Sequence, residues 1–336
     1  MENALISFPL FGEGYAFNIS NHITIFGLDI YIYGIVIALG FLLAAIYLLF
    51  RRKDFDLSQD NVMDIFICAI PSAIVGARLF YIAFNPSEYF GAGKWQNIFN
   101  IRQGGLAVYG GIILSVIVLF IYVRVKKISA GALFDVSSLG LLIGQAVGRW
   151  GNFFNREAFG TPTSLPWKMG LISGSTTIYV HPTFLYESLW NIVGFLLLHF
   201  YSKKRRKYDG QIFLMYIAWY GFGRYIIEGL RTDSLYFSNS DIRISQFIAA
   251  LTFSAAVVLL SVFRLKGKTF VKAGVSDADA EGILDEYSTD DETEPVSNGM
   301  TEAADTDASE GLDEVTSNDE SVDGAAEDES DNGASE

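Results

Sequence analysis

Residues 30–50 read IYIYGIVIALGFLLAAIYLLF, a run without a charged side chain. A helix needs about 20 mostly apolar residues to cross a hydrocarbon core roughly 30 Å thick, so this stretch predicts a membrane-spanning helix. Six further segments have the same character. The predicted spans are residues 30–50, 61–84, 105–123, 132–150, 182–201, 211–228 and 242–263. We therefore predict an all-α fold, a polytopic bundle of seven transmembrane helices.

Basic residues gather after every second predicted span. Clusters stand at residues 51–53, 124–127, 203–207 and 264–272, after the first, third, fifth and seventh spans. Cytoplasmic loops of membrane proteins carry an excess of Lys and Arg, so these ends are expected in the cytoplasm. The N-terminus is then outside, and seven spans place the C-terminus in the cytoplasm.

The two ends of the chain differ in charge. Residues 273–336 carry 23 Asp and Glu and no Lys or Arg, whereas residues 1–272 hold all 24 Lys and Arg against 15 acids. The acidic segment is also poor in aromatic residues and cannot bury enough apolar surface to offset its ordering entropy. We predict a seven-helix transmembrane domain over residues 1–272 and a disordered acidic cytoplasmic tail over residues 273–336.

Nine basic residues lie outside the four clusters, and the predicted topology places all of them toward the outer face. They are Arg78, Lys94, Arg102, Arg149, Arg156, Lys168, Arg224, Arg231 and Arg243. Charged groups at membrane depth are costly and usually mark a functional path. Arg78, about two turns from the outer end of its span, can alternatively be an anchor that reaches the interface.

The end of the fourth span is unusually polar. It reads Gly148-Arg149-Trp150-Gly151-Asn152-Phe153-Phe154-Asn155-Arg156-Glu157-Ala158-Phe159-Gly160. If the helix continued, Arg149, Asn152 and Arg156 would share one face. The three glycines instead favour a break that exposes backbone amides to an anion.

A second charged group closes the sixth span. Arg224, Glu228 and Arg231 are spaced i, i+4 and i+7, on one helical stripe. A glutamate between two arginines stays ionised and can fix the direction of a guanidinium group. The alternative is an ion-pair ladder joining helices, but a ladder leaves net positive charge, which favours an anionic ligand.

Three more segments reach the same level of the membrane. They are Tyr33-Gly34, the stretch Gln103-Gly104-Gly105 to Tyr109-Gly110-Gly111, and His181-Pro182 to Tyr186-Glu187. The two glycine pairs permit close helix contact or a bend. An interfacial tyrosine is often only an anchor, and His181 can equally be a helix cap. No metal-ligand spacing, nucleotide fingerprint or Gly-x-Ser-x-Gly elbow is present. Together the residues indicate an anionic, lipid-accessible ligand such as a phosphate ester.

These blocks resemble the prolipoprotein diacylglyceryl transferase family. Residues Gly148 to Gly160 are similar to its signature almost residue by residue, and the other blocks follow in the same order over roughly residues 5–265. The resemblance implies that the membrane domain is catalytic. It implies transfer of the diacylglyceryl group of phosphatidylglycerol to the lipobox cysteine of preprolipoproteins, with release of glycerol 1-phosphate. It also implies a bacterial plasma membrane protein among membrane lipids, with its site toward the outer face, no cofactor or metal, and no nucleic-acid partner.

From the resemblance and from the chemistry of a departing phosphate we predict roles for individual residues. The catalytic set is Arg149, Arg224, Tyr109, Tyr33 and Glu157, and the phosphatidylglycerol-binding set is Arg149, Asn152, Gly160, Glu228, Arg231, Arg78 and His181. Arg149 and Arg231 would clamp the phosphate, with Arg224 near the reaction centre. Glu228 would orient the arginines, and Glu157 would fix Arg149 or the glycerol hydroxyls.

The general base is left open by the sequence. Many relatives carry His where this chain has Tyr109, and a free phenol titrates near pH 10, so Tyr109 is a weaker base at neutral pH. Tyr33, His181 and Glu157 are alternatives, as is activation of the thiol by positive potential alone.

Two other classes of protein remain to be weighed. A transporter or lipid-binding protein for an anionic solute could also present outer arginines on seven spans, but the sequence shows no pair of interrupted helices in corresponding halves. An intramembrane protease is not favoured, because the spans lack a paired-Asp or a Ser/His arrangement.

Overall fold

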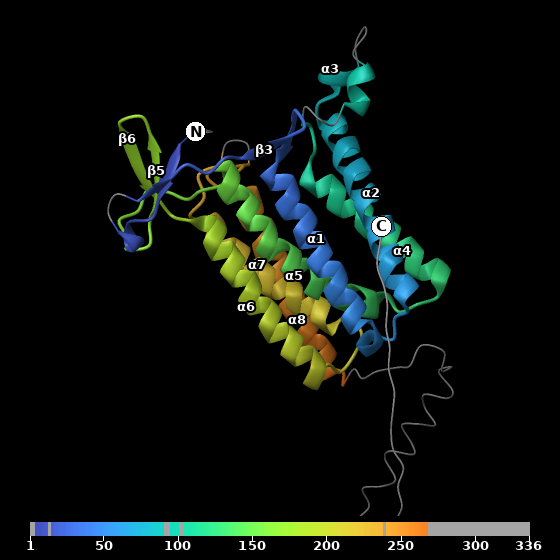
Figure 1. Ribbon diagram of the computed structural model, residues 1–336. Coiled ribbons are helices and arrows are strands. Elements are labelled where there is room, and N and C mark those ends of the chain that lie inside the picture. The colour runs from blue at the N-terminus through green and yellow to red at the C-terminus, as the bar shows by residue number, and fades with distance from the viewer. Residues whose placement is uncertain (1–3, 13–14, 91–94, 101–103, 238–239, 268–336) are drawn as a thin grey trace, which may run out of the picture. The chain divides into compact units, whose positions relative to one another are not determined.

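The structure, a computed structural model, describes residues 4–12, 15–90, 95–100, 104–237 and 240–267. The predicted tail of residues 273–336 and Gln103 lie outside the described residues. The chain is mostly helical (Figure 1). Its long helices are α1 (Ile32–Arg51), α2 (Gln59–Phe84), α4 (Val108–Lys126), α5 (Ala130–Asn155), α6 (Thr183–Lys204), α7 (Gln211–Glu228) and α8 (Ile244–Leu265). Each of the seven predicted spans coincides with one of them to within a few residues.

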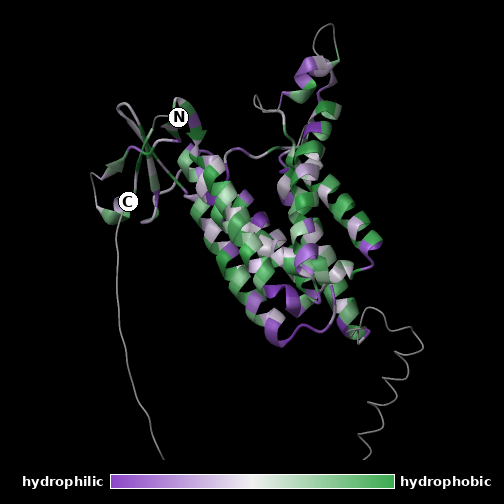
Figure 2. Ribbon diagram, turned by 45° about the vertical axis from the view of Figure 1, so that its right-hand side comes forward, coloured by the Kyte–Doolittle hydropathy of each residue, from purple (hydrophilic) through white to green (hydrophobic). Residues whose placement is uncertain are grey.

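Six helices in the described part of the chain are long and apolar enough to cross a membrane, namely α1, α2, α4, α5, α6 and α8. Apolar residues cover most of the length of the helices, and polar residues collect near their ends (Figure 2). Helix α7 is not among the six. It carries Gln211, Arg224 and Glu228, and it packs against α5, α6 and α8. The chain is therefore a multi-pass membrane protein with a seventh, more polar helix inside the bundle.

The all-α prediction is incomplete, because strands form outside the predicted spans. Strands β1 (Leu5–Ser7), β2 (Ala16–Phe17), β5 (Met169–Ser173) and β6 (Thr176–Val180) make an antiparallel sheet in the order β2-β1-β5-β6. Strands β3 (His22–Ile25) and β4 (Leu28–Tyr31) form a separate hairpin directly before α1. Short helical turns complete the chain: η1 (Pro9–Phe11), η2 (Arg52–Phe55), α3 (Pro86–Tyr89) and η3 (Trp95–Phe99).

The four-stranded sheet has a local cause in the sequence. Gly174, at φ +59°, makes the turn between β5 and β6, and the β-branched residues of 176–180 follow it. Ile6 and Leu171, 1% and 2% exposed, form the centre of a small apolar cluster with Phe184 at the start of α6. The cluster attaches the sheet to the end of the bundle at which α6 begins.

Helix α5 is the centre of the bundle. It packs against α1, α6 and α7, and its residues Leu133, Val136 and Leu139 are fully buried. Helix α5 has a larger buried share than any of the other five candidate spans. Its direction therefore fixes where the polar residues at its far end will lie.

Helices α2 and α4 pair through glycine. A Cβ atom on Gly76 would lie 2.4 Å from the carbonyl oxygen of Gly110, so only glycine permits this backbone approach. Gly104 and Gly105 have φ of +91° and +74°, a backbone conformation that glycine adopts without strain. The predicted close helix contact is confirmed for the pair Gly110-Gly111.

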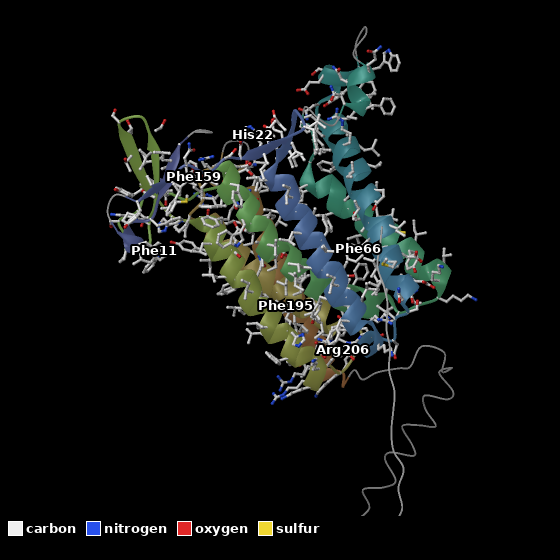
Figure 3. All side chains as sticks on the ribbon, viewed as in Figure 1. Phe11, His22, Phe66, Phe159, Phe195 and Arg206 are labelled. Carbon is white, nitrogen blue, oxygen red and sulfur yellow. The ribbon has the colours of Figure 1, made fainter. Side chains whose placement is uncertain are left out.

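Basic residues of different helices meet at the opposite end of the bundle. The buried side chain of Arg51 donates to Asp54 (2.5 Å) and to Ser202 at the end of α6 (3.0 Å). Arg206 donates to the fully buried Asp135 of α5 (2.9 Å). Figure 3 labels Arg206 at this end, with Phe159 and His22 at the other. The C-terminal ends of α1 and α6 thus lie together.

Candidate functional site

Three arginines from distant parts of the chain converge on the carboxylate of Glu187 in the first turns of α6. Arg149 at the end of α5 places Nη2 2.6 Å from Oε2 of Glu187. Arg224 of α7 and Arg231 beyond α7 place their Nη1 atoms 3.3 Å and 3.1 Å from Oε1. Glu187 is 5% exposed, so its charge is almost removed from solvent. The charge is instead matched by guanidinium groups, as a buried carboxylate requires.

A second buried carboxylate orients the same arginines. Oε2 of Glu228, which is 2% exposed, lies 2.6 Å from Nη2 of Arg224 and 3.9 Å from Nε of Arg231. The guanidinium of Arg243 donates to the backbone carbonyl of Glu228 and so fixes the end of α7. The prediction grouped Arg224, Glu228 and Arg231, and the structure brings all three together.

Helix α5 remains regular through the polar motif, so the predicted break at the glycines is wrong. The helix ends only at Arg156, which adopts a left-handed conformation (φ 52°). Gly151 has a packing role instead, because a Cβ atom there would lie 2.7 Å from the ring of Tyr33 in α1. A close contact between helices, rather than exposed amides, explains this glycine.

A chain of hydrogen bonds connects Arg149 to Glu157 through Asn152. Nη1 of Arg149 donates to Oδ1 of Asn152 (3.3 Å), and Nδ2 of Asn152 donates to Oε1 of Glu157 (2.8 Å). Asn155 also donates to the same oxygen of Glu157 (3.4 Å). Glu157 is exposed at the end of the helix and does not contact Arg149 directly. The amide of Asn152 connects the two side chains by hydrogen bonds.

Arg156 lies in the same motif but has a different environment. It is 5% exposed, and its Nε donates to the carbonyl oxygen of Ala4 (2.6 Å), while Nη2 donates to the carbonyl oxygen of Ile19. Arg156 therefore holds the N-terminal segment against α5. It does not share a face with Arg149 and Asn152, because the helix ends at this residue.

Asp233 is a further partner of the arginine group. Its two carboxylate oxygens accept from Nε and Nη2 of Arg231 (2.9 Å and 2.6 Å). Burial alone would lower the pKa of Arg231, but the bonds and charges of Asp233 and Glu187 outweigh it and raise that pKa. Burial raises the pKa of Asp233, and the Arg231 guanidinium outweighs it and lowers that pKa. Arg231 is thus held on both sides by carboxylates.

Two of the arginines keep hydrogen-bond donors that an anion can use. Among the described residues, the Nε groups of Arg149 and Arg224 donate to no acceptor. The side chains of Arg149 and Arg224 are 22% and 17% exposed. The guanidinium fork matches phosphate oxygens, so Arg149 and Arg224 can receive a phosphate group.

The backbone segments of Gly160 and His181 lie next to the segment that carries Arg231. The backbone N–H of Gly160 donates to the carbonyl of His181 (2.9 Å), and a Cβ atom on Gly160 would lie 2.6 Å from Cβ of His181. The next residue, Thr161, donates to the carbonyl of Leu230 (2.7 Å), adjacent to Arg231. Only glycine lets these three segments approach so closely.

The imidazole of His181 is oriented toward a different region. Its Nδ1 lies 3.2 Å from the hydroxyl of Tyr186. It lines an apolar pocket of about 420 Å³ together with Leu165, Trp167, Leu185, Tyr186, Leu189 and Leu230.

Two predicted residues lie apart from the arginine group. Arg78, 7% exposed, uses its guanidinium to close the loop before α4. It donates to the carbonyl oxygens of Ile98 (3.0 Å), Gly104 (2.8 Å), Gly105 (2.9 Å), Asn97 (2.5 Å) and Asn100 (2.9 Å). Tyr109 is 41% exposed on α4 and makes no hydrogen bond within the described residues.

Glu187 and Asp233 were not among the predicted site residues. Glu187 is the one acidic residue in the predicted span 182–201, and an ionisable residue inside a span is a functional candidate by default. That signal was sufficient to find it. Asp233 follows Arg231 by two residues, and only the folded loop shows that the two side chains face each other.

The chain matches the family model "Prolipoprotein diacylglyceryl transferase" over residues 21–262. Relatives with the name phosphatidylglycerol–prolipoprotein diacylglyceryl transferase include proteins from Finegoldia magna and Clostridioides difficile. The first is 44% identical over 236 residues, covering 70% of this chain and 92% of the relative. The second is 44% identical over 212 residues, covering 63% and 83%. A protein of the same name from Clostridium botulinum is 42% identical over 239 residues, covering 69% and 89%. The arginine group thus lies within a chain that belongs to the prolipoprotein diacylglyceryl transferase family.

Proposed function

We propose that this transferase moves the diacylglyceryl group of phosphatidylglycerol to the lipobox cysteine of preprolipoproteins, at the outer face of a bacterial plasma membrane. The observation that carries the proposal is the convergence of Arg149, Arg224 and Arg231 on Glu187 at one end of a membrane bundle. The names of the relatives supply the two substrates. The positive charge of the arginine group supports a phosphate-binding role.

The reaction is a displacement at carbon. The cysteine sulfur attacks the glyceryl carbon that carries the phosphate, a C–S bond forms, and the C–O bond breaks. The electron pair of that bond leaves with glycerol 1-phosphate, and the thiol proton passes to a protein acceptor or to solvent. Negative charge grows on the leaving phosphate, so fixed guanidinium groups stabilise the transition state.

The contacts favour a division of roles among the arginines. Arg149 and Arg224 keep free Nε donors, so we assign the phosphate to them. The donors Nε and Nη2 of Arg231 are already bonded to Asp233, so we do not assign Arg231 to the phosphate together with Arg149. We assign it a role in holding Glu187 in position. Glu187 and Glu228 fix the guanidinium groups, and Gly160 permits the loops beneath them to close.

Asn152, Glu157 and Tyr33 have supporting roles, in orienting Arg149 and in accepting the proton of the cysteine thiol. Asn152 accepts from Arg149 and donates to Glu157. These bonds favour a role for Glu157 in orienting Arg149 over a role in binding the glycerol hydroxyls. The ring of Tyr33 packs against Gly151 of α5, whereas Tyr109 makes no hydrogen bond within the described residues, and we assign Tyr33 as the proton acceptor ahead of Tyr109 and His181.

Reconstitution tests the reaction. The purified protein in vesicles that contain phosphatidylglycerol should add one diacylglyceryl group to a synthetic lipobox peptide, detected by mass spectrometry. A peptide with serine in place of the cysteine is the control and should stay unmodified. In the same assay, Tyr33→Phe should slow transfer more than Tyr109→Phe. Flux of an anionic solute without a covalent product would show a transporter instead.

The topology has its own test. We propose seven crossings, with the N-terminus outside and the C-terminal segment of residues 273–336 in the cytoplasm. A reporter that is active only outside the cell should be active when inserted in the loop after Glu157 and inactive after Lys207. Activity in the opposite pattern would place the arginine group in the cytosol and remove the proposed function.

A further inference from the structure

The next helical turn beneath the arginine group carries two amide side chains. Gln145 precedes Arg149 by four residues in α5, and Asn191 follows Glu187 by four residues in α6. Residues four apart share a helix face, and α5 and α6 run antiparallel. Ser188 of α6 donates to the carbonyl of Ala146 in α5 (2.8 Å), which sets the register between the two helices. Both amides therefore face the interior, one turn deeper than the contact between Arg149 and Glu187.

Both amides have an oxygen that accepts no hydrogen bond. Nε2 of Gln145 donates to the hydroxyl of Tyr216 in α7 (2.9 Å), but its Oε1 is buried and without a donor among the described residues. Asn191 is 3% exposed, and its Oδ1 is likewise buried without a donor in the described part of the chain. Buried polar groups are nearly always hydrogen-bonded, so two such oxygens beside one site require a partner.

Several neighbouring donor groups are bonded to other acceptors. The indole groups of Trp190 and Trp219 stack at 4.3 Å between centroids, and each donates to the backbone carbonyl of the other (3.1 Å and 3.0 Å). The hydroxyl of Ser188 donates to Ala146. A hydroxyl group of a molecule that enters the site can supply the donor that these two oxygens lack.

We propose that Gln145 and Asn191 form a hydroxyl-binding subsite that receives the terminal glycerol of the phospholipid head group. The inference rests on the proposed function, which places the phosphate on Arg149 and Arg224. One helical turn rises about 5.4 Å, a distance that a glycerol unit attached to that phosphate can span. A hydroxyl group donates and accepts, so it satisfies an amide in either orientation.

The subsite gives the enzyme selectivity for a polyol head group. A site built to hydrogen-bond a hydroxyl discriminates against an analogue that lacks it, because its buried polar groups are left unpaired. The arginines alone cannot supply this selectivity, since they bind the phosphate that all such lipids share.

The experiment compares two lipids in the reconstituted enzyme. Phosphatidylglycerol and phosphatidylpropanol have the same phosphodiester, but the three-carbon head group of the second has no hydroxyl. The wild type should prefer phosphatidylglycerol in kcat/KM by about tenfold or more. In Gln145→Leu and Asn191→Leu this preference should fall toward unity, while transfer from phosphatidylpropanol persists.

A control variant separates recognition from packing. Ser137→Ala removes another buried oxygen that has no hydrogen-bond partner among the described residues, two turns deeper in α5, and should leave the lipid preference unchanged. If both lipids lose activity in parallel, or if the wild type shows no preference, the two amides hold only water and the inference is overturned. Transfer from neither lipid by the wild type would instead refute the proposed function.

Discussion

Replacing Glu187 with glutamine is expected to lower kcat/KM for diacylglyceryl transfer by about 100-fold or more, a loss typical of a disturbed electrostatic site. Glu187 is the shared partner of Arg149, Arg224 and Arg231, and it is nearly buried. Glutamine keeps the shape of the side chain but removes its charge and one acceptor oxygen. The three guanidinium groups would then repel one another across a low-dielectric interior and lose their fixed directions.

The measurement needs a stability reading beside the rate. Removing one partner of a buried ion pair costs about 3–5 kcal/mol, so thermal unfolding of Glu187→Gln should be followed in the same detergent or nanodisc. Asp233→Asn is the matched control, because its carboxylate contacts Arg231 but is 48% exposed. It should reduce activity only a few-fold. Near-normal turnover of Glu187→Gln would show that the arginines do not depend on a common carboxylate.

The positions of the long helices were predictable because the bilayer sets a simple requirement. An uncharged run such as residues 30–50 has few alternatives to a spanning helix, and α1 occupies Ile32–Arg51. Residues 211–228 were also predicted as a helix from their apolar character, and α7 occupies them, although it is too polar to be among the six candidate spans. The pattern failed outside the membrane. Residues 171–180 are rich in β-branched residues around Ser-Gly-Ser, but short strands depend on a distant partner, here Leu5–Ser7.

The candidate site was predictable in composition but not in arrangement. Ionisable residues among apolar ones are rare enough to identify Arg149, Arg224 and Glu228 without a structure. Spacing along one helix could not show that Glu187, on another helix, joins them. Nor could it separate Arg149 from Arg156. Seven residues apart in one motif, the first faces Glu187 and the second faces backbone carbonyls of the N-terminal segment.

Arg78 shows the same ambiguity for a buried arginine. Its depth in the second predicted span indicated either an anchor or a site residue. In the structure all its contacts are with carbonyl oxygens of the loop before α4 and with the ring of Tyr89, 4.9 Å away. A guanidinium group has five donors and can organise a whole loop, which the sequence alone does not distinguish from binding a ligand.

Arg149→Lys is expected to lower kcat by about 10²–10³-fold while leaving the fold intact. Lysine retains the positive charge, so a site that needed only charge would tolerate it. Arg149 instead donates to Glu187 and Asn152, and its Nε has no acceptor among the described residues and can bind a ligand. The single ammonium nitrogen of lysine cannot reproduce the planar fork that binds two phosphate oxygens while keeping both protein contacts.

The matched control for Arg149→Lys is Arg156→Lys, in the same motif. Arg156 contacts backbone carbonyls of Ala4, Ile19 and Phe154, so this variant should lower the unfolding temperature more than it lowers turnover of the folded enzyme. Rates and unfolding temperatures measured on both variants in phosphatidylglycerol vesicles would distinguish the two arginines. Near-normal turnover of Arg149→Lys would mean that positive potential suffices. The geometry of the arginine group would then serve stability rather than phosphate recognition.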